Sequence, residues 1–137
     1  MTQDRITVET RVHAPIATVW RAYTSPDDIR QWNFASPDWH CPAAQVDLRE
    51  GGAFSSRMEA KDGSMGFDFA GTYTKVVQNE RLEYAFGDRQ AVVEFHEDGD
   101  AVRVRVTFDP DGEYPRDMQA SGWQAILENF ARHAEDQ

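Results

Sequence analysis

Residues 102–134 read VRVRVTFDPDGEYPRDMQASGWQAILENFARHA and contain two different hydrophobic periods. In residues 102–108 apolar and polar side chains alternate, which predicts a strand with one buried face. The Asp-Pro-Asp-Gly segment at 109–112 ends this strand. In residues 116–134 apolar side chains recur every three or four positions, which predicts a helix with one apolar face. The stretch therefore predicts a sheet whose apolar face is covered by a long helix.

The alternation recurs upstream of this stretch in several runs that are separated by turn residues. These runs lie at about residues 44–48, 54–58, 65–77, 82–86 and 93–95. The turns lie at Gly51-Gly52, at 61–64, at 78–80, at Gly87-Asp88 and at 97–100. Connections this short predict antiparallel neighbours, because parallel strands need long crossovers.

The N-terminal part predicts one more strand and two short helices. Residues 5–13 alternate in the same way as the later strands. Pro15 suits the first turn of a helix, and Ser25 is the expected N-cap of a second helix that ends near Trp32. The following segment, 33–42, contains two prolines and is expected to be a loop, and Asp117 is the expected cap of the C-terminal helix.

Together these elements predict an α+β fold. We expect a curved antiparallel sheet of six or seven strands around a long C-terminal helix, with two short helices after the first strand. The length of 137 residues favours a single domain that spans residues 1–137.

The composition of the chain disfavours several classes of binding partner. The formal net charge is −10, so phosphate backbones of nucleic acids and anionic membrane surfaces are unfavourable partners. No apolar run approaches the roughly 20 residues of a membrane-spanning helix, so no membrane insertion is expected. The N-terminus lacks the pattern of a signal peptide, which predicts a cytoplasmic location. Cys41 is the single cysteine, and no His or carboxylate spacing suggests a metal site, so no metal and no cofactor are expected.

Several short motifs occur in a fixed order along the chain. They are Val12-His13-Ala14-Pro15, Val19-Trp20, Trp32, Asp47-Leu48-Arg49, Gly51-Gly52-Ala53-Phe54, Phe69-Ala70-Gly71-Thr72-Tyr73, Asn79-Glu80-Arg81-Leu82, and Gly122-Trp123 with Leu127 and Phe130. In this order they resemble the START/Bet v 1-like (SRPBCC) superfamily. They resemble most its activator of heat-shock-protein-90 ATPase homologue-like branch, from Ile6 to His133.

The resemblance implies a helix-grip fold and a cavity between the sheet and the long helix. Members of the superfamily bind lipids, hormones or polyketides there, and some are cyclases or hydrolases. The branch takes its name from a co-chaperone. Fold alone does not decide among these roles, since one fold carries many functions.

Aromatic side chains are the strongest candidates for such a site. Those on the expected inward face of the sheet and on the helix could line a pocket or form plain core. The predicted ligand-binding residues are Trp32, Trp39, His40, Met58, Phe67, Phe69, Tyr73, Tyr84, Phe86, Trp123, Ile126 and Phe130. Among them Tyr73, Tyr84 and His40 are the polar groups expected to orient a ligand.

Three functions stay open at this point. The first is binding of an apolar small molecule in the cavity. The second is an enzyme of cyclase or hydrolase type that uses the same cavity, although no catalytic residues are identified. The third is a protein–protein module of co-chaperone type. An open sheet also leaves an edge strand that can pair with a second copy, so a homodimer is expected.

Overall fold

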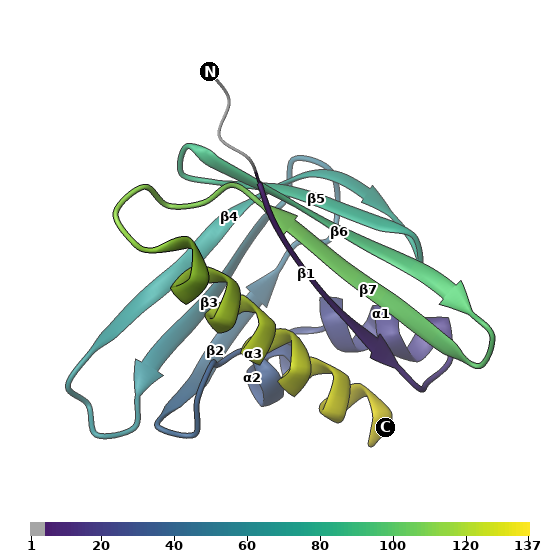
Figure 1. Cartoon of the computed structure of the whole chain (residues 1–137), viewed down its shortest axis with the longest axis horizontal. Helices are drawn as coiled ribbons and strands as arrows, with labels where there is room; N and C mark the ends of the chain where they lie inside the picture. Colours follow the sequence, from purple (N-terminus) through teal and green to yellow (C-terminus); the bar gives the residue numbers. More distant parts are fainter. Residues whose placement is uncertain (1–4) are drawn as a thin grey trace.

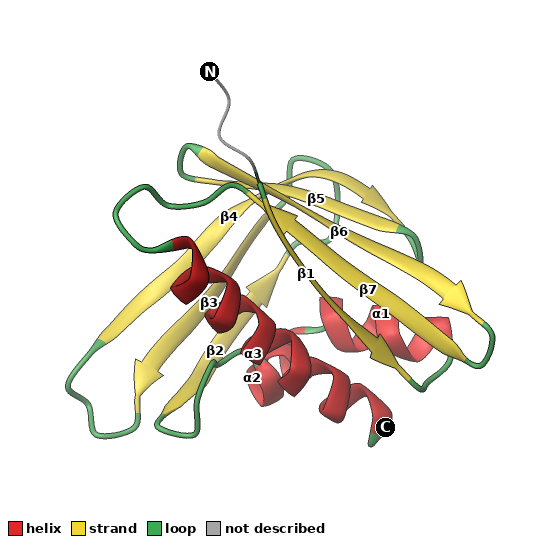
Figure 2. Ribbon diagram, in the orientation of Figure 1, coloured by secondary structure: helices red, strands yellow, loops and turns green. Residues whose placement is uncertain are grey.

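Seven strands form one antiparallel sheet in the order β1-β7-β6-β5-β4-β3-β2 in the computed structural model, which describes residues 5–137. The sheet curls around the long helix α3, and the short helices α1 and α2 close one end (Figures 1 and 2). The elements are β1 (Ile6–Val12), α1 (Ile16–Thr24), α2 (Pro26–Trp32), β2 (Trp39–Val46), β3 (Ala53–Ala60), β4 (Gly66–Val77), β5 (Arg81–Phe86), β6 (Arg89–Asp98), β7 (Ala101–Phe108) and α3 (Arg116–Glu135). The predicted α+β helix-grip fold is confirmed.

Two tight hairpins set the register of the central strands. Phe86 pairs with Arg89, so Gly87-Asp88 forms a two-residue turn, and Asp98 pairs with Ala101 around Gly99-Asp100. Gly87 and Gly99 have positive φ angles of 65° and 66°, which glycine adopts without the steric cost of a side chain. Both predicted turns are confirmed.

The predicted loop over residues 33–42 is confirmed for residues 33–38 and wrong for residues 39–42, because β2 begins at Trp39. Trp39 and His40 pair with Ala60 and Glu59 of β3, and the register then shifts between His40 and Ala43. β2 is the last strand of the sheet. A proline without a backbone N–H is tolerated at an edge irregularity of this kind, so Pro42 does not stop the strand. Its other end also differs, since β2 ends at Val46 and Leu48 lies outside it.

The predicted helix caps are also wrong in detail. Ser25 occupies the N-cap position of α2, but its side chain makes no capping hydrogen bond. Pro115, not Asp117, is the N-cap of α3, and Asp117 lies in the first turn. There its carboxylate still interacts favourably with the helix dipole.

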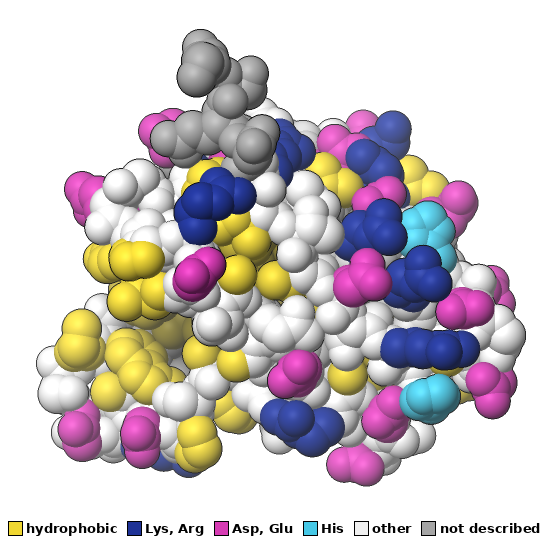
Figure 3. All heavy atoms as spheres, in the orientation of Figure 1, with side chains coloured by type: hydrophobic (Ala, Val, Ile, Leu, Met, Phe, Trp, Pro, Cys, Tyr) yellow, Lys and Arg dark blue, Asp and Glu magenta, His cyan; other side chains and the backbone are white. Residues whose placement is uncertain are grey.

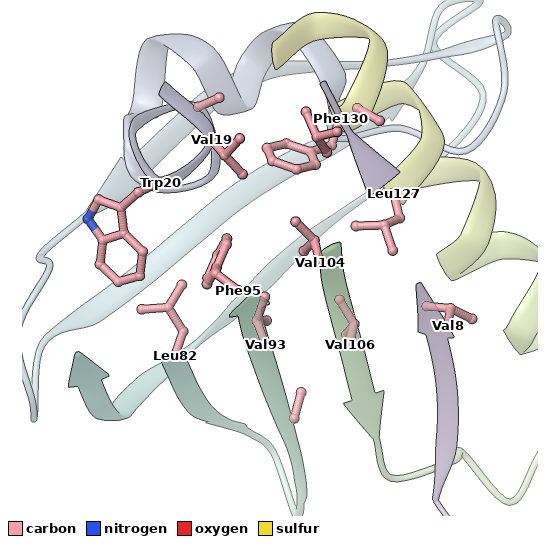
Figure 4. Close-up of a cluster of buried hydrophobic side chains, with 14 of the residues drawn as sticks. Val8, Val19, Trp20, Leu82, Val93, Phe95, Val104, Val106, Leu127 and Phe130 are labelled. Carbon is pink, nitrogen blue, oxygen red and sulfur yellow. The ribbon is translucent and has the colours of Figure 1, made fainter. Parts of the chain in front are cut away.

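The main core lies where α1, α2 and the C-terminal half of α3 meet the sheet. Figure 4 shows Phe130 of α3 beside Val19 of α1, with Val104 and Phe95 of the sheet nearby. Phe130 is fully buried, and its ring lies 5.0 Å from that of Tyr23 and 5.1 Å from that of Trp32. The indole N–H of Trp32 donates to the carbonyl oxygen of Ala22 at 2.8 Å, which ties α2 to α1.

The two halves of α3 pack differently. Its buried residues all lie in the C-terminal half and are Leu127, Phe130, Ala131 and Ala134. Residues 122–126 are only half-buried, and residues 116–118 are exposed. Gly122 has no heavy atom within 4 Å of the position a Cβ would take, so it does not mark a close approach. The N-terminal half of α3 is therefore less deeply buried against the sheet than the C-terminal half.

The outer face of the sheet is charged. Arg105 pairs with Glu9 at 3.0 Å, Arg81 with Glu94 at 3.2 Å, and Arg57 with Asp68 at 3.6 Å. Figure 3 shows acidic and basic side chains interspersed on the right, where β1, β7 and β6 lie. None of the helices within residues 5–137 is long and apolar enough to cross a membrane.

Candidate functional site

A cavity of about 300 Å³ lies between the middle of α3, at Trp123, Ile126 and Leu127, and the inward face of the sheet. Side chains of α1 and α2 and the residue after α2 close one end of it. The lining residues are Tyr23, Ile29, Trp32, Asn33, Phe54, Ser56, Met58, Phe67, Phe69, Tyr73, Leu82, Tyr84, Arg89, Val106, Trp123, Ile126 and Leu127. Figure 3 shows a hollow on the left, with apolar side chains gathered around it. The cavity is at the small end of the range for ligand pockets.

Most of the residues predicted for the site meet at this cavity. Those that line it are Trp32, Met58, Phe67, Phe69, Tyr73, Tyr84, Trp123 and Ile126. They come from α2, β3, β4, β5 and α3, and the curl of the sheet brings these elements together. Phe67 is also 50% exposed, which places it at the rim rather than deep inside.

Four predicted site residues lie elsewhere. Phe86 and Phe130 are buried in the core, where Phe69 and Trp123 cover Phe86 and helices α1 and α2 cover Phe130. Trp39 packs on Phe67, with 6.0 Å between the ring centroids, and does not line the cavity. His40 lies on β2 with its side chain 43% exposed and its Nε2 3.7 Å from Oε1 of Glu59. These four residues are not part of the cavity wall.

Several lining residues were not predicted. Phe54 and Ser56 share an inward face with Met58, and Leu82 shares one with Tyr84, so strand alternation was a usable signal for them. Arg89 had a usable signal as well, because a two-residue turn places it opposite Phe86 on the inward face. The remaining lining residues are Tyr23, Ile29, Asn33, Val106 and Leu127, whose approach to the cavity depends on how helices and strands pack.

Aromatic rings form one wall of the cavity. Trp123 of α3 stacks on Phe108, with 3.9 Å between centroids and 9° between ring planes. Phe69 of β4 meets Trp123 edge to face at 6.2 Å and contacts Tyr84 at 6.3 Å. Because Phe108 is fully buried behind Trp123, the indole is held against the core while its other side faces the cavity.

Three tyrosines supply most of the hydroxyl groups of the cavity. Phenols are protonated at neutral pH, and burial strengthens this here: it raises the pKa of Tyr73 to about 12 and also raises the pKa of Tyr23 and Tyr84. Their hydroxyls make no hydrogen bond to any residue from 5 to 137. Because the three side chains line the cavity, these O–H groups are available to a bound molecule.

The raised pKa of Tyr73 should make the stability of the protein depend on pH in the alkaline range. Its pKa is about 12 in the folded chain and about 10 when exposed, so above pH 10 the unfolded chain releases the proton first. The contribution of Tyr73 to the free energy of unfolding is therefore fully present below pH 10. As the pH rises toward 12 this contribution falls by about 2–3 kcal/mol in total. Urea unfolding between pH 9 and 11, roughly, should show this loss, with a shallower fall for Tyr73→Phe. Equal pH dependence in both proteins would contradict the assignment.

Arg89 is the charged side chain in the cavity wall. Its guanidinium carbon lies 4.5 Å from the centroid of the Phe86 ring, and its Nη1 donates to the carbonyl oxygen of Asp109 at 3.4 Å. Among residues 5–137, no aspartate, glutamate or histidine lines the cavity. The wall formed by the described residues thus combines apolar surface with hydrogen-bond donors and one cation. Within that part of the chain it lacks a side chain that could act as a general base at neutral pH.

Cys41 offers no reactive thiol. It is 3% exposed, and its thiol donates a weak hydrogen bond to the carbonyl oxygen of Ala43 at 3.4 Å. Burial raises its pKa, which disfavours the thiolate that a nucleophile needs. No group of His, Cys, Asp or Glu able to hold a metal ion occurs in residues 5–137.

Comparison with known proteins places this geometry in a family. The sequence profile of the family described as "Activator of Hsp90 ATPase homolog 1-like protein" matches residues 13–135. The chain is 42% identical to an AHSA1-like protein from Aeromonas hydrophila, with a TM-score of 0.91 over 96% of this chain and 92% of that one. It is 47% identical to a protein from Cytophaga hutchinsonii, with a TM-score of 0.83 over 98% and 94% of the two chains.

A more distant structure shares the fold alone. A protein from Chromobacterium violaceum is 23% identical, with a TM-score of 0.87 over 97% of this chain and 99% of that one. No curated protein matches this chain at a significant level.

Proposed function

This chain belongs to the activator of Hsp90 ATPase homolog 1-like family, within the SRPBCC superfamily, and we propose that it binds a small, mainly apolar molecule in the cavity between the sheet and α3. The family match confirms the resemblance seen in the sequence motifs. It leaves both ligand binding and co-chaperone roles open, so the proposal rests on the cavity itself.

The observation that carries the proposal is an aromatic cavity whose phenol hydroxyls have no partner within the described chain. A wall that served only as core would be closed by packing, since protein interiors leave few voids larger than a water molecule. Here about 300 Å³ stays open beside Phe69, Tyr84 and Trp123. Burial of an apolar molecule against these rings would be favourable, and the hydroxyls would orient it.

The enzyme alternative has less support. The phenols of Tyr23, Tyr73 and Tyr84 are protonated at neutral pH, and burial raises their pKa further. They can therefore donate hydrogen bonds but are poor bases. The co-chaperone alternative has some support from exposed apolar side chains, which include Met65, Phe67, Tyr114 and Met118. Phe67 among them lines the cavity, so its exposure also fits ligand binding, which remains the function favoured.

A neutral fluorescent probe tests the proposal. We expect N-phenyl-1-naphthylamine, which carries no charge, to bind the folded protein and gain fluorescence. The variant Phe69→Trp places a larger ring in the wall and should weaken binding by about tenfold or more, while circular dichroism stays that of the wild type.

Tyr114→Trp is the matched control, because it adds an indole at a residue that is 55% exposed and outside the cavity wall. Its affinity for the probe should equal that of the wild type. A wild-type protein that never binds the probe, or a Phe69→Trp variant that binds it equally well, would refute ligand binding in this cavity.

A further inference from the structure

We propose that the molecule bound in the cavity is an apolar acid, and that Arg89 binds its carboxylate. This inference rests on the proposed function and adds the chemical class of the ligand. Of the described residues that line the cavity, Arg89 is the charged one.

The fold places Arg89 on the inward face of the sheet. Arg89 is the first residue of β6 and pairs directly with Phe86 across the two-residue turn Gly87-Asp88. Residues that pair directly across an antiparallel sheet point to the same face, and Phe86 points inward. The guanidinium therefore lies over the Phe86 ring, 4.5 Å from its centroid, where the contact with the ring favours the cation.

This guanidinium has no carboxylate partner among residues 5–137. Within residues 5–137 its polar contact is the 3.4 Å hydrogen bond to the backbone oxygen of Asp109. The carboxylate of Asp109 is occupied elsewhere, since it accepts from Nε of Arg5 at 3.0 Å and from the backbone N–H of Gln90 at 2.8 Å. Arginines of the outer face differ, because Arg81 pairs with Glu83 and Glu94.

The lack of a partner is informative in so acidic a chain. With 24 acidic and 14 basic residues, carboxylates are plentiful, yet none lies within 4.0 Å of the Arg89 nitrogens in the described chain. Arg89 is half-buried, so water solvates its charge only in part, and an anionic partner would stabilise it. A planar carboxylate can accept two parallel hydrogen bonds from a guanidinium, which makes it a suitable partner.

The neighbouring phenol supports an acceptor group on the ligand. Tyr84 lines the same cavity, and its hydroxyl is near enough to Arg89 for the positive charge to act on its pKa. Burial outweighs that effect and keeps the phenol protonated. An O–H donor beside a cation complements a carboxylate and disfavours an ammonium group. The aromatic wall around them would bury the apolar body of the molecule.

Two matched probes test the charge directly. Naphthalene-2-carboxylate and naphthalene-2-carboxamide have the same ring system, and only the first is charged at neutral pH. Calorimetry on the full chain should show that the wild type binds the carboxylate about tenfold or more tightly than the amide. In Arg89→Gln this preference should disappear, while the affinity for the amide changes by less than about threefold.

Arg103→Gln is the control, since it removes the same charge from the outer face of β7, where Arg103 pairs with Asp98. It should keep the wild-type preference. Equal affinity of the wild type for acid and amide would overturn the inference, and this comparison needs no variant to fold. Loss of preference in both variants would also overturn it, because the effect would then be one of overall charge.

The neutral probe distinguishes ligand binding in the cavity from the preference for an acid. If N-phenyl-1-naphthylamine binds in the cavity but the acid has no advantage, ligand binding stands and the assignment of an acid fails. If neither the neutral probe nor the acid binds, both the proposed function and the inference fail.

Discussion

Replacing Phe130 by Ala should lower the free energy of unfolding by about 3–5 kcal/mol, the largest effect expected in this protein. Phe130 is fully buried, and it joins α3 to α1 and α2 through Tyr23 and Trp32. Its removal would leave a void among three helices that cannot close without moving all of them. Chemical unfolding followed by circular dichroism measures this loss.

Two variants on the same helix calibrate the effect. Met118→Ala should change stability by less than about 0.5 kcal/mol, because Met118 is 58% exposed. Trp123→Ala should cost less than Phe130→Ala, since one side of the indole already faces the cavity and has fewer contacts to lose. An equal loss for Phe130→Ala and Met118→Ala would mean that Phe130 is not at the centre of the core.

Gly71→Ala is expected to destabilise the protein by about 2–3 kcal/mol, although Ala is normally the better strand residue. A Cβ at this position would lie 2.2 Å from the carbonyl oxygen of Ala85 and 2.9 Å from Cζ of the Phe54 ring. The oxygen belongs to the backbone of β5, so relief requires a shift of the strand itself. Urea unfolding measures the change.

The same substitution at Gly122 should have the opposite sign. Gly122 lies inside α3 and an added Cβ would meet nothing within 4 Å, so Gly122→Ala should stabilise the protein by about 0.5–1 kcal/mol. Because both variants add one methyl group in place of Gly, their difference isolates the steric effect at Gly71. If Gly71→Ala stabilised the protein as Gly122→Ala does, the backbone of β5 could not lie so close to Gly71.

Local patterns in the sequence were sufficient to predict the architecture of the fold. Alternation along residues 102–108 and the helical period of residues 116–134 predicted β7 and α3, and short turns predicted antiparallel neighbours. These features depend on contacts between residues close in the chain, so they are visible in the sequence. The N-terminal end of β2 was missed because Pro42 suggested a loop, and only its position at a sheet edge makes a strand compatible with proline.

The candidate site was only partly accessible from local patterns. Alternation predicted which strand residues point inward, and most of the predicted site residues on the inner face, such as Phe69 and Tyr84, line the cavity. Alternation does not say which inward residues are covered. Phe86 points inward as well, but Phe69, Trp123 and Arg89 surround its ring.

The sequence by itself determined the inward and outward faces of the strands and the apolar side of α3, because these follow from the periods of two and 3.6 residues. Only the tertiary structure decided where the inward side chains leave a cavity. The end of α3 around Phe130 packs tightly against α1 and α2, whereas the middle of the helix, at Trp123 and Ile126, leaves space above the curled sheet. That difference depends on how far helices and sheet approach one another, which is set by packing between residues distant in the chain.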